Sequence, residues 1–302
     1  MTRCLIAAGC LVLAACASVP EAPAMAACGP AEQFAGEGDA RADAVAALPA
    51  AERDALALDM VACLENPDPA IRDGFAYETY AAMMRGNLLQ PDALRTLKSA
   101  LLENLTAAGD DPGGFRGPFA ALVLSEVART DRISPWMTPE EREGLVAAAA
   151  AYMTGLSDYR GFDDAEGWRH GVAHAADIFL QLSLNEALTR EEADTILAAI
   201  AAKAATPDHA YTFGEPERLA APVLYLSRRD LYTPEEWTGW FTSLWPEDDP
   251  LRETAYSSEA ALARKHNLMA FAEAVYVSAA ASGNEVYAPV GEASLALIRS
   301  LP

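Results

Sequence analysis

The sequence is poor in positive charge and in β-branched residues. Its 302 residues carry 22 lysines and arginines against 44 aspartates and glutamates, which gives a net charge of −22. Such a surface repels nucleic acid phosphates and anionic lipid head groups, so nucleic acid is not expected as a partner. Segments with the alternating pattern of a sheet are also lacking. Alanine is frequent instead, and it favours helix because it loses no side-chain entropy there.

Several motifs of catalysis and binding are absent as well. The sequence contains no GxSxG, no P-loop and no CxxC. It therefore gives no sign of a nucleophile elbow, a phosphate-binding loop, a thioredoxin-like site or a zinc ribbon. The 52% of hydrophobic residues is enough for a sizeable core, in one compact domain or one helical-repeat array.

The first residues are typical of a secretory signal. A short positive start is followed by an apolar run at residues 4–12, which is too short to span a bilayer. The stretch "LAAC" that ends at Cys16 resembles a bacterial lipobox. This resemblance implies a signal peptide over residues 1–15 and a lipid on Cys16. The alternative is an ordinary signal peptide that is cut later, within residues 22–27.

The residue after Cys16 is alanine rather than aspartate. By resemblance to lipoproteins of Gram-negative bacteria, this implies a lipid anchor on the periplasmic face of the outer membrane. Residues 16–45 are rich in alanine, proline, glycine and acidic residues, and we expect a flexible tether there. The folded domain is predicted over residues 46–302.

Two cysteines remain beyond the lipobox, Cys28 and Cys63. In an oxidising compartment such an even pair is a candidate disulfide, which would pin the N-terminal arm to the first helices. The alternative is that Cys63 is a small buried residue, since free cysteine is often buried.

A weak repeat runs through the predicted domain. Each unit has an acidic or proline-rich turn, an arginine and an apolar helix, and the arginines recur at intervals of roughly 50 residues: Arg72, Arg116, Arg169, Arg218 and Arg264. This period is typical of HEAT-like arrays with two helices per unit. We therefore predict an all-α fold, a HEAT-like helical-repeat array (an αα-superhelix), with a closed αα-toroid as the alternative.

Helix starts are marked by capping boxes, in which a threonine accepts from the third backbone N–H and a glutamate reaches back. Three such pairs occur, and an aspartate–glutamate pair predicts a similar start for the next helix: Thr138 with Glu141, Thr189 with Glu192, Thr233 with Glu236, and Asp163 with Glu166.

The stretch "GWRHGVAHAADIF" (residues 167–179) contains the pattern HxxxHxxD. On a helix, His170, His174 and Asp177 share one face and could hold zinc or another divalent metal. Gly171 stands where the metalloprotease pattern HExxH has its glutamate, so no catalytic base is built in. The alternative is a buried hydrogen-bonded network.

From about residue 60 to 245 the chain resembles the bacterial family called domain of unknown function 2785. The motifs "NPDPAIRDGFAY", "GFRGPFAALVL", "DYRGFDDAEGWRHGVAHAADIF" and "GEPERLA" carry the resemblance. Pro118 departs from it, because the family usually has a serine–phenylalanine run there. The family brings no established activity, but it implies that the polar residues of the third motif form one constellation.

Neighbouring helix starts line one edge of a repeat array, so we predict a polar pocket with the two histidines on its floor. Its expected residues are Arg116, Asp158, Arg160, Trp168, His170, His174, Asp177, Glu215 and Arg218. The arginines have an alternative role, because HEAT-like arginines often bond an acidic group of the preceding repeat. Nearby aromatic residues could stack on a sugar or pack in the core: Tyr159, Phe162, Trp168, Tyr211 and Phe213.

Two functions are compatible with such a pocket. The first is an envelope binding or scaffolding module for a peptide, a glycan or another protein. The alternative is a hydrolase, either with a metal-activated water or with an oriented histidine base. Its candidate catalytic residues are His170, His174, Asp177 and Asp158. A further variant uses two carboxylates, Asp158 and Glu215, as a glycosidase would.

Overall fold

The computed structural model describes residues 28–34, 38–107 and 111–302. In this part of the chain the predicted all-α class is confirmed, with only two short strands. The predicted signal peptide, the lipidation site Cys16 and the tether up to residue 27 lie outside the described residues. Among the helices described, none combines the length and the apolar character needed to cross a membrane.

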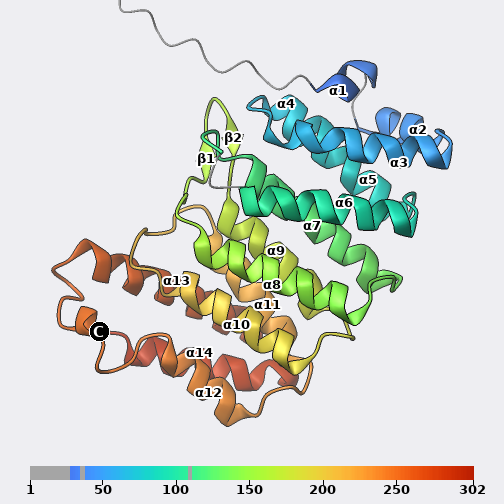
Figure 1. The fold of residues 1–302 in the computed structure, drawn as a ribbon. Helices are drawn as coiled ribbons and strands as arrows, with labels where there is room; N and C mark the ends of the chain where they lie inside the picture. Colours follow the sequence, from blue (N-terminus) through green and yellow to red (C-terminus); the bar gives the residue numbers. More distant parts are fainter. Residues whose placement is uncertain (1–27, 35–37, 108–110) are drawn as a thin grey trace, which may run out of the picture.

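The N-terminal part consists of short elements (Figure 1). They are α1 (Gly29–Gln33), α2 (Asp39–Ala46), α3 (Ala50–Asp59), the 3-10 helix η1 (Met60–Glu65), α4 (Pro69–Ile71), the π-helix η2 (Arg72–Tyr77) and α5 (Glu78–Arg85).

Two rows of longer helices follow. In one row, α7, α9, α11 and α13 pack against one another in succession. In the other row, α6, α8 and α10 do the same, and α14 packs on both α12 and α13. The bounds are α6 (Pro91–Thr106), α7 (Arg116–Ile133), α8 (Pro139–Gly155), α9 (Gly171–Ser183), α10 (Arg190–Ala204), α11 (Glu215–Ser227), α12 (Pro234–Ser243), α13 (Glu259–Ser282) and α14 (Ala288–Ser300). Two 3-10 turns lie between these helices: η4 (Pro250–Arg252) between α12 and α13, and η5 (Glu285–Tyr287) between α13 and α14.

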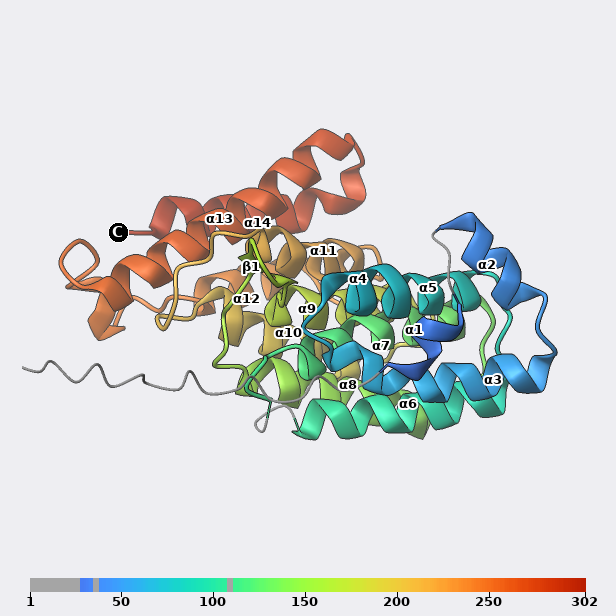
Figure 2. The ribbon, with the colours of Figure 1, turned by 90° about the horizontal axis from the view of Figure 1, so that it is seen from above.

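The first and the last helices lie at opposite ends of the molecule in both views (Figures 1 and 2). The rows therefore do not close into a ring. This arrangement differs from the closed αα-toroid of the alternative prediction. Consecutive helices alternate between the rows, so that the N-terminal ends of α7, α9 and α11 follow loops at one edge.

The capping chemistry explains where several helices begin. The three predicted threonine–glutamate boxes are confirmed at the starts of α8, α10 and α12, each with both hydrogen bonds formed. The pair Asp163 and Glu166 does not cap a helix, so that prediction is wrong. Asp163 Oδ1 instead accepts from the backbone N–H groups of Ala165 and Glu166, at 2.8 and 3.0 Å, and closes a hairpin turn.

The predicted boundary of the folded domain at residue 46 is too late. Helix α2 begins at Asp39, and Val45 is completely buried. Arg41 lies against the Phe75 ring and donates to Glu78 at 2.7 Å. These contacts bring described residues of the predicted tether, from residue 38 on, into the packed structure.

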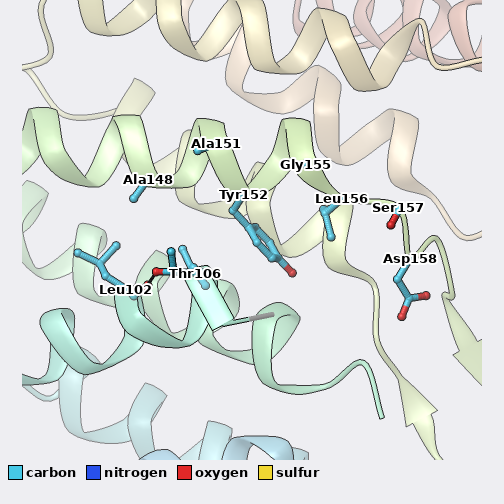
Figure 3. A pocket seen from close by; sticks show the side chains of 10 residues that line it. Leu102, Thr106, Ala148, Ala151, Tyr152, Gly155, Leu156, Ser157 and Asp158 are labelled. Carbon is cyan, nitrogen blue, oxygen red and sulfur yellow. Dashed lines mark hydrogen bonds between the residues drawn. The ribbon is translucent and has the colours of Figure 1, made fainter. Parts of the chain in front are cut away.

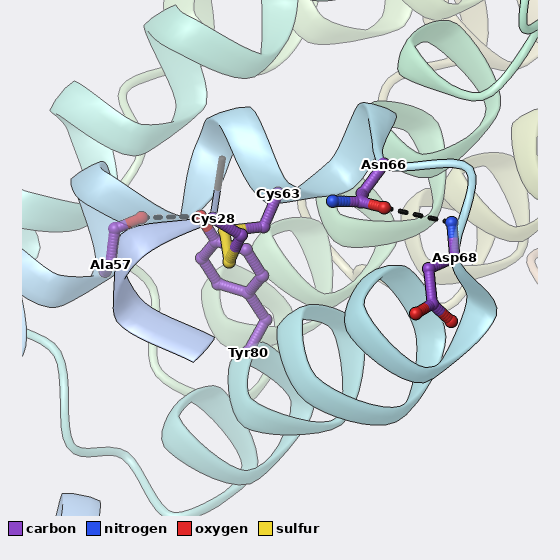
Figure 4. Close-up of a disulfide and its surroundings, with 6 residues drawn as sticks. All are labelled: Cys28, Ala57, Cys63, Asn66, Asp68 and Tyr80. Carbon is purple, nitrogen blue, oxygen red and sulfur yellow. Dashed lines mark hydrogen bonds between the residues drawn. A yellow bond between two sulfur atoms is a disulfide. The ribbon is translucent and has the colours of Figure 1, made fainter. Parts of the chain in front are cut away.

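Cys28 and Cys63 form a disulfide, which is one of the two alternatives that the sequence leaves open (Figure 4). Both cysteines are buried, and Cys63 belongs to η1. Beside them the Tyr80 hydroxyl donates to the carbonyl of Ala57, which joins α5 to α3. The bond therefore attaches the segment before α1 to the hydrophobic core of the first units.

Candidate ligand-binding site

A hairpin separates α8 from α9. Its strands are β1 (Phe162–Asp163) and β2 (Gly167–Trp168), with Phe162 paired to Trp168. Gly167 has a φ of 75°, a conformation that glycine adopts without the steric cost of a Cβ. The pairing continues beyond β2, because Arg169 N donates to the carbonyl of Gly161 at 2.9 Å.

His170 joins the hairpin to α9 in the left-handed conformation, with φ at 57°. Its backbone N–H donates to the carbonyl of Arg160 at 3.1 Å, and its carbonyl accepts from His174 N at 3.0 Å. Histidine is among the residues that enter this region more often than most. His170 thus ends the hairpin and precedes the first turn of the helix, and its imidazole is buried.

Three exposed aromatic rings, Phe162, Trp168 and Phe213, form what we call the aromatic cluster. Their exposed fractions are 45%, 39% and 38%. The Trp168 ring lies 5.1 Å from Phe162 and 5.9 Å from Phe213, and it stacks on His170 at 4.8 Å. A Cβ at Gly161 would overlap the Phe213 ring, so the glycine lets this ring lie against the backbone. The cluster is an apolar surface in contact with water.

A cavity of about 650 Å³, which we call the hairpin hollow, lies beside the cluster. Two of its walls are rings of the cluster. The other side chains lining it are mainly charged or aromatic: Asp158, Tyr159, Arg160, Asp163, Glu166, Arg169 and His209.

The charged side chains of the hollow pair with one another. Arg160 Nε donates to both carboxylate oxygens of Asp158, at 2.9 and 3.0 Å. Arg169 donates to Glu166 Oε2 at 2.6 Å and to the Gly113 carbonyl at 2.7 Å. Burial opposes ionisation of Asp158, but the hydrogen bonds and charge of Arg160 outweigh it and lower the pKa. The hollow therefore offers fixed, mutually compensated hydrogen-bonding groups.

One side of the hollow is formed by Tyr159, between α8 and β1, and by His209 in the loop before α11. Tyr159 and His209 stack with ring centroids 5.2 Å apart and planes only 7° from parallel. Lys203 Nζ donates to the Tyr159 hydroxyl at 3.1 Å and holds it in place. His209 could not be predicted from the sequence, because an isolated histidine in a loop belongs to no pattern.

Behind the aromatic cluster lies a buried group of ionisable side chains. His170 Nε2 is buried, has no hydrogen-bond partner among the described residues, and lies 3.7 Å from Glu215 Oε1. Burial, with a contribution from Arg218, lowers the pKa of His170 to about 4. Burial also raises the pKa of Glu215. His170 is therefore uncharged at neutral pH, and Glu215 does not line the hollow.

The structure does not assemble the predicted metal site. His174 Nδ1 donates to the carbonyl of Pro118 at 3.1 Å. Asp177 is held by Arg218, whose Nε donates to Oδ1 at 2.9 Å while Nη2 donates to Oδ2. Within the described ranges, no group of three histidine, cysteine, aspartate or glutamate side chains could hold a metal ion. His174 and Asp177 lie on α9, but His170 precedes this helix in the left-handed conformation, and Arg218 of a neighbouring helix pairs with the carboxylate of Asp177.

The same contacts weaken the predicted histidine base. Burial, followed by the charges of His170 and Arg218, lowers the pKa of His174 to about 3. Its Nδ1 donates to the carbonyl of Pro118 rather than to Asp177 or Asp158. Burial raises the pKa of Asp177 despite its arginine partner. The histidines are thus neutral groups inside the fold.

Residues 101–277 match a family described as "protein of unknown function (DUF2785)". The chain belongs to this family. No curated protein and no solved structure matches it. The matched segment begins and ends later than the range of 60–245 expected from the motifs. It includes the hairpin, the hairpin hollow and the aromatic cluster, so the whole candidate site is part of the family domain.

The structure brings only some of the residues predicted for the pocket to the hairpin hollow. Asp158 and Arg160 line the hollow, and Trp168 packs on two of its rings. The remaining predicted residues have other surroundings: His170, His174 and Glu215 are buried behind the cluster, and Asp177 pairs with Arg218.

Arg116 does not enter the hollow, and its alternative role is the observed one. Its Nε donates to Glu65 Oε2 at 2.6 Å, which ties α7 to η1 of the preceding unit. Arg72 is completely buried and lies over the rings of Phe115 and Phe119, at 4.1 and 4.7 Å. Both arginines therefore hold neighbouring units together.

Proposed function

We propose that this protein is a saccharide-binding module and that the hairpin hollow is its binding site. The observation that carries the proposal is the exposed aromatic cluster beside a hollow of charged groups that are already paired. Aromatic rings offer a flat apolar surface to the C–H face of a sugar. Ligand sites in general combine such surfaces with a few fixed polar groups.

The charge pattern favours a neutral polyhydroxyl ligand over an ion. Asp158 is compensated by Arg160 and Glu166 by Arg169, so neither a strongly anionic nor a strongly cationic ligand finds an unpaired countercharge in those pairs. Carboxylates and guanidinium groups in fixed positions are strong partners for hydroxyl groups. A glycan carries no charge that needs a partner, and it has many hydroxyl groups for these hydrogen bonds. A phosphorylated ligand would instead be repelled by the acidic surface of the whole chain.

Titration calorimetry with chitotriose, cellotriose and maltotriose tests the proposal. At least one trisaccharide is expected to bind, and Trp168→Ala is expected to weaken it about tenfold because a stacking ring is lost. Tyr276→Ala provides the matched control, since Tyr276 on α13 is exposed to 38%, nearly as much as Trp168. Equal weakening by both variants, or no binding at millimolar sugar, would contradict the proposal. Sugar cleavage during the titration would favour the hydrolase alternative.

We further propose that the protein is a lipoprotein anchored through Cys16 on the periplasmic face of the outer membrane. The lipobox-like "LAAC" and the disulfide between Cys28 and Cys63 support this, because disulfides form in oxidising compartments. Membrane fractionation of cells that produce the wild type and Cys16→Ser tests it. The wild type is expected with the membranes and the variant is not.

We also propose that the two helix rows form a HEAT-like superhelix. Successive packing of α7, α9, α11 and α13 supports this assignment. An experimental structure with a regular rotation from one helix pair to the next would agree with it, and irregular pair-to-pair angles would argue against it.

A further inference from the structure

A second cavity adjoins the hairpin hollow. It is a groove of about 370 Å³ between the C-terminal halves of α6 and α8. Ser157 and Asp158 line both the groove and the hollow. A ligand in the hollow could therefore extend into the groove past these two residues. Figure 3 shows Ser157 and Asp158 at one end of the groove, and Leu102 and Ala148 toward the other.

The groove differs from the hollow in its chemistry. Its walls are mainly the apolar side chains of Leu102, Leu105, Ala148, Ala151 and Leu156, together with the ring of Tyr152. Apart from Asp158 at the shared end, none of the described residues that line it is charged. In a chain with a net charge of −22, an uncharged groove next to a charged hollow is a sharp local contrast.

The polar atoms of the two helical walls offer a peptide few partners. The Tyr152 hydroxyl is buried and has no hydrogen-bond partner among the described residues. The Thr106 hydroxyl already donates to the carbonyl of Leu102 at 2.8 Å. The backbone groups of the two helical walls are largely used within the helices. A peptide main chain would lose hydrogen bonds to water and find few replacements, which costs free energy for each unpaired group. An aliphatic chain carries no such groups, and its burial is favourable in proportion to its area.

We infer that the ligand is an amphiphile: a saccharide head group in the hairpin hollow and an aliphatic tail in the groove between α6 and α8. This rests on the proposed saccharide binding, because the head group occupies the same hollow. The shared residues Ser157 and Asp158 mark the junction between head and tail. The ligand class is therefore a glycolipid rather than a free glycan.

Binding of maltose and of octyl, decyl and dodecyl β-D-maltoside to the purified protein tests the inference, with each detergent below its critical micelle concentration. Affinity is expected to rise about twofold to fourfold for each added methylene, as for a chain that is partly to fully buried. No dependence on chain length, or no binding of the dodecyl compound, would overturn the inference.

Two variants and one control localise the tail. Ala151→Glu and Thr106→Glu place a charge on either wall of the groove, at exposed positions where folding tolerates it. Both are expected to abolish the chain-length dependence. Ala147→Glu adds the same charge at an exposed position of α8 that does not line the groove, and it is expected to leave the dependence intact. Dependence that survives in both groove variants would overturn the inference.

The outcome for the head group is separate. Suppose that Trp168→Ala leaves the affinity for all maltosides unchanged while the groove variants remove the chain-length dependence. The tail site in the groove is then supported and the saccharide site is contradicted. If Trp168→Ala weakens maltose and every maltoside alike and chain length has no effect, the saccharide site stands and the inference fails. A blocked trileucine peptide that competes equally well with dodecyl maltoside would assign the groove to peptides instead.

Discussion

Lowering the pH from 7 to 5 is expected to destabilise the protein through two buried histidines. His170 and His174 are exposed by only 8% and 7%, and their pKa values fall from the ordinary 6.5 to about 4 and about 3. The unfolded chain takes up protons below pH 6.5, whereas the folded chain does not until the pH nears 4. Stability present at neutral pH is therefore lost as the pH falls through this window.

The linkage relation gives the magnitude. At pH 5 each unfolded histidine is about 97% protonated, while its folded counterpart is at most about 10% protonated, which costs about 2 kcal/mol per residue and about 4 kcal/mol for the pair. The carboxyl groups of Glu215 and Asp177 act in the opposite direction, because burial raises their pKa values and the folded state binds their protons more readily. The net loss in the wild type is therefore smaller than the sum for the histidines.

Urea unfolding at pH 7 and pH 5, followed by circular dichroism, isolates the histidine contribution. His174→Gln and His170→Gln remove one titrating group each, so each variant is expected to lose about 2 kcal/mol less than the wild type between the two pH values. The same substitution at His266, which is exposed on α13, is the control. An equal loss in the wild type and both variants would refute the assignment of these histidines as buried neutral groups.

Three further predictions concern the frame of the site. Gly161→Ala is expected to lower the free energy of unfolding by about 1–3 kcal/mol, because the new Cβ overlaps the Phe213 ring; thermal unfolding measures it, and an unchanged melting temperature would contradict it. Reduction of the bond between Cys28 and Cys63, which are 35 residues apart, is expected to cost about 4 kcal/mol in urea unfolding, and a variant with serine at both positions should no longer respond to reductant. Added zinc or a chelator is expected to leave the melting temperature unchanged, since the described residues assemble no metal-binding group; a stoichiometric rise with zinc would overturn that.

Local chemistry made the helix starts predictable. The boxes at Thr138, Thr189 and Thr233 depend on groups three residues apart, so the sequence contains all of the information. The same reasoning failed at Asp163, because a carboxylate that accepts from nearby backbone N–H groups closes a hairpin turn as readily as it caps a helix. Strands of two residues are also too short to show an alternating pattern.

The site was predictable in position but not in its contacts. The motif at residues 158–179 indicates this part of the chain, and the hollow lies there. However, the partner of Asp177 is Arg218, 41 residues away on the next helix of the row, and no local spacing indicates that pair. The contribution of His209 likewise depends on how a loop folds back over Tyr159.

The central claim is that a saccharide occupies the hairpin hollow, and hydrogen–deuterium exchange with and without the trisaccharide that binds most tightly in calorimetry tests it most directly. The account predicts slower exchange confined to residues 157–170 and 209–215, where the hairpin and the loop before α11 surround the hollow. Protection elsewhere on the protein, or an unchanged exchange pattern at saturating sugar, would contradict it.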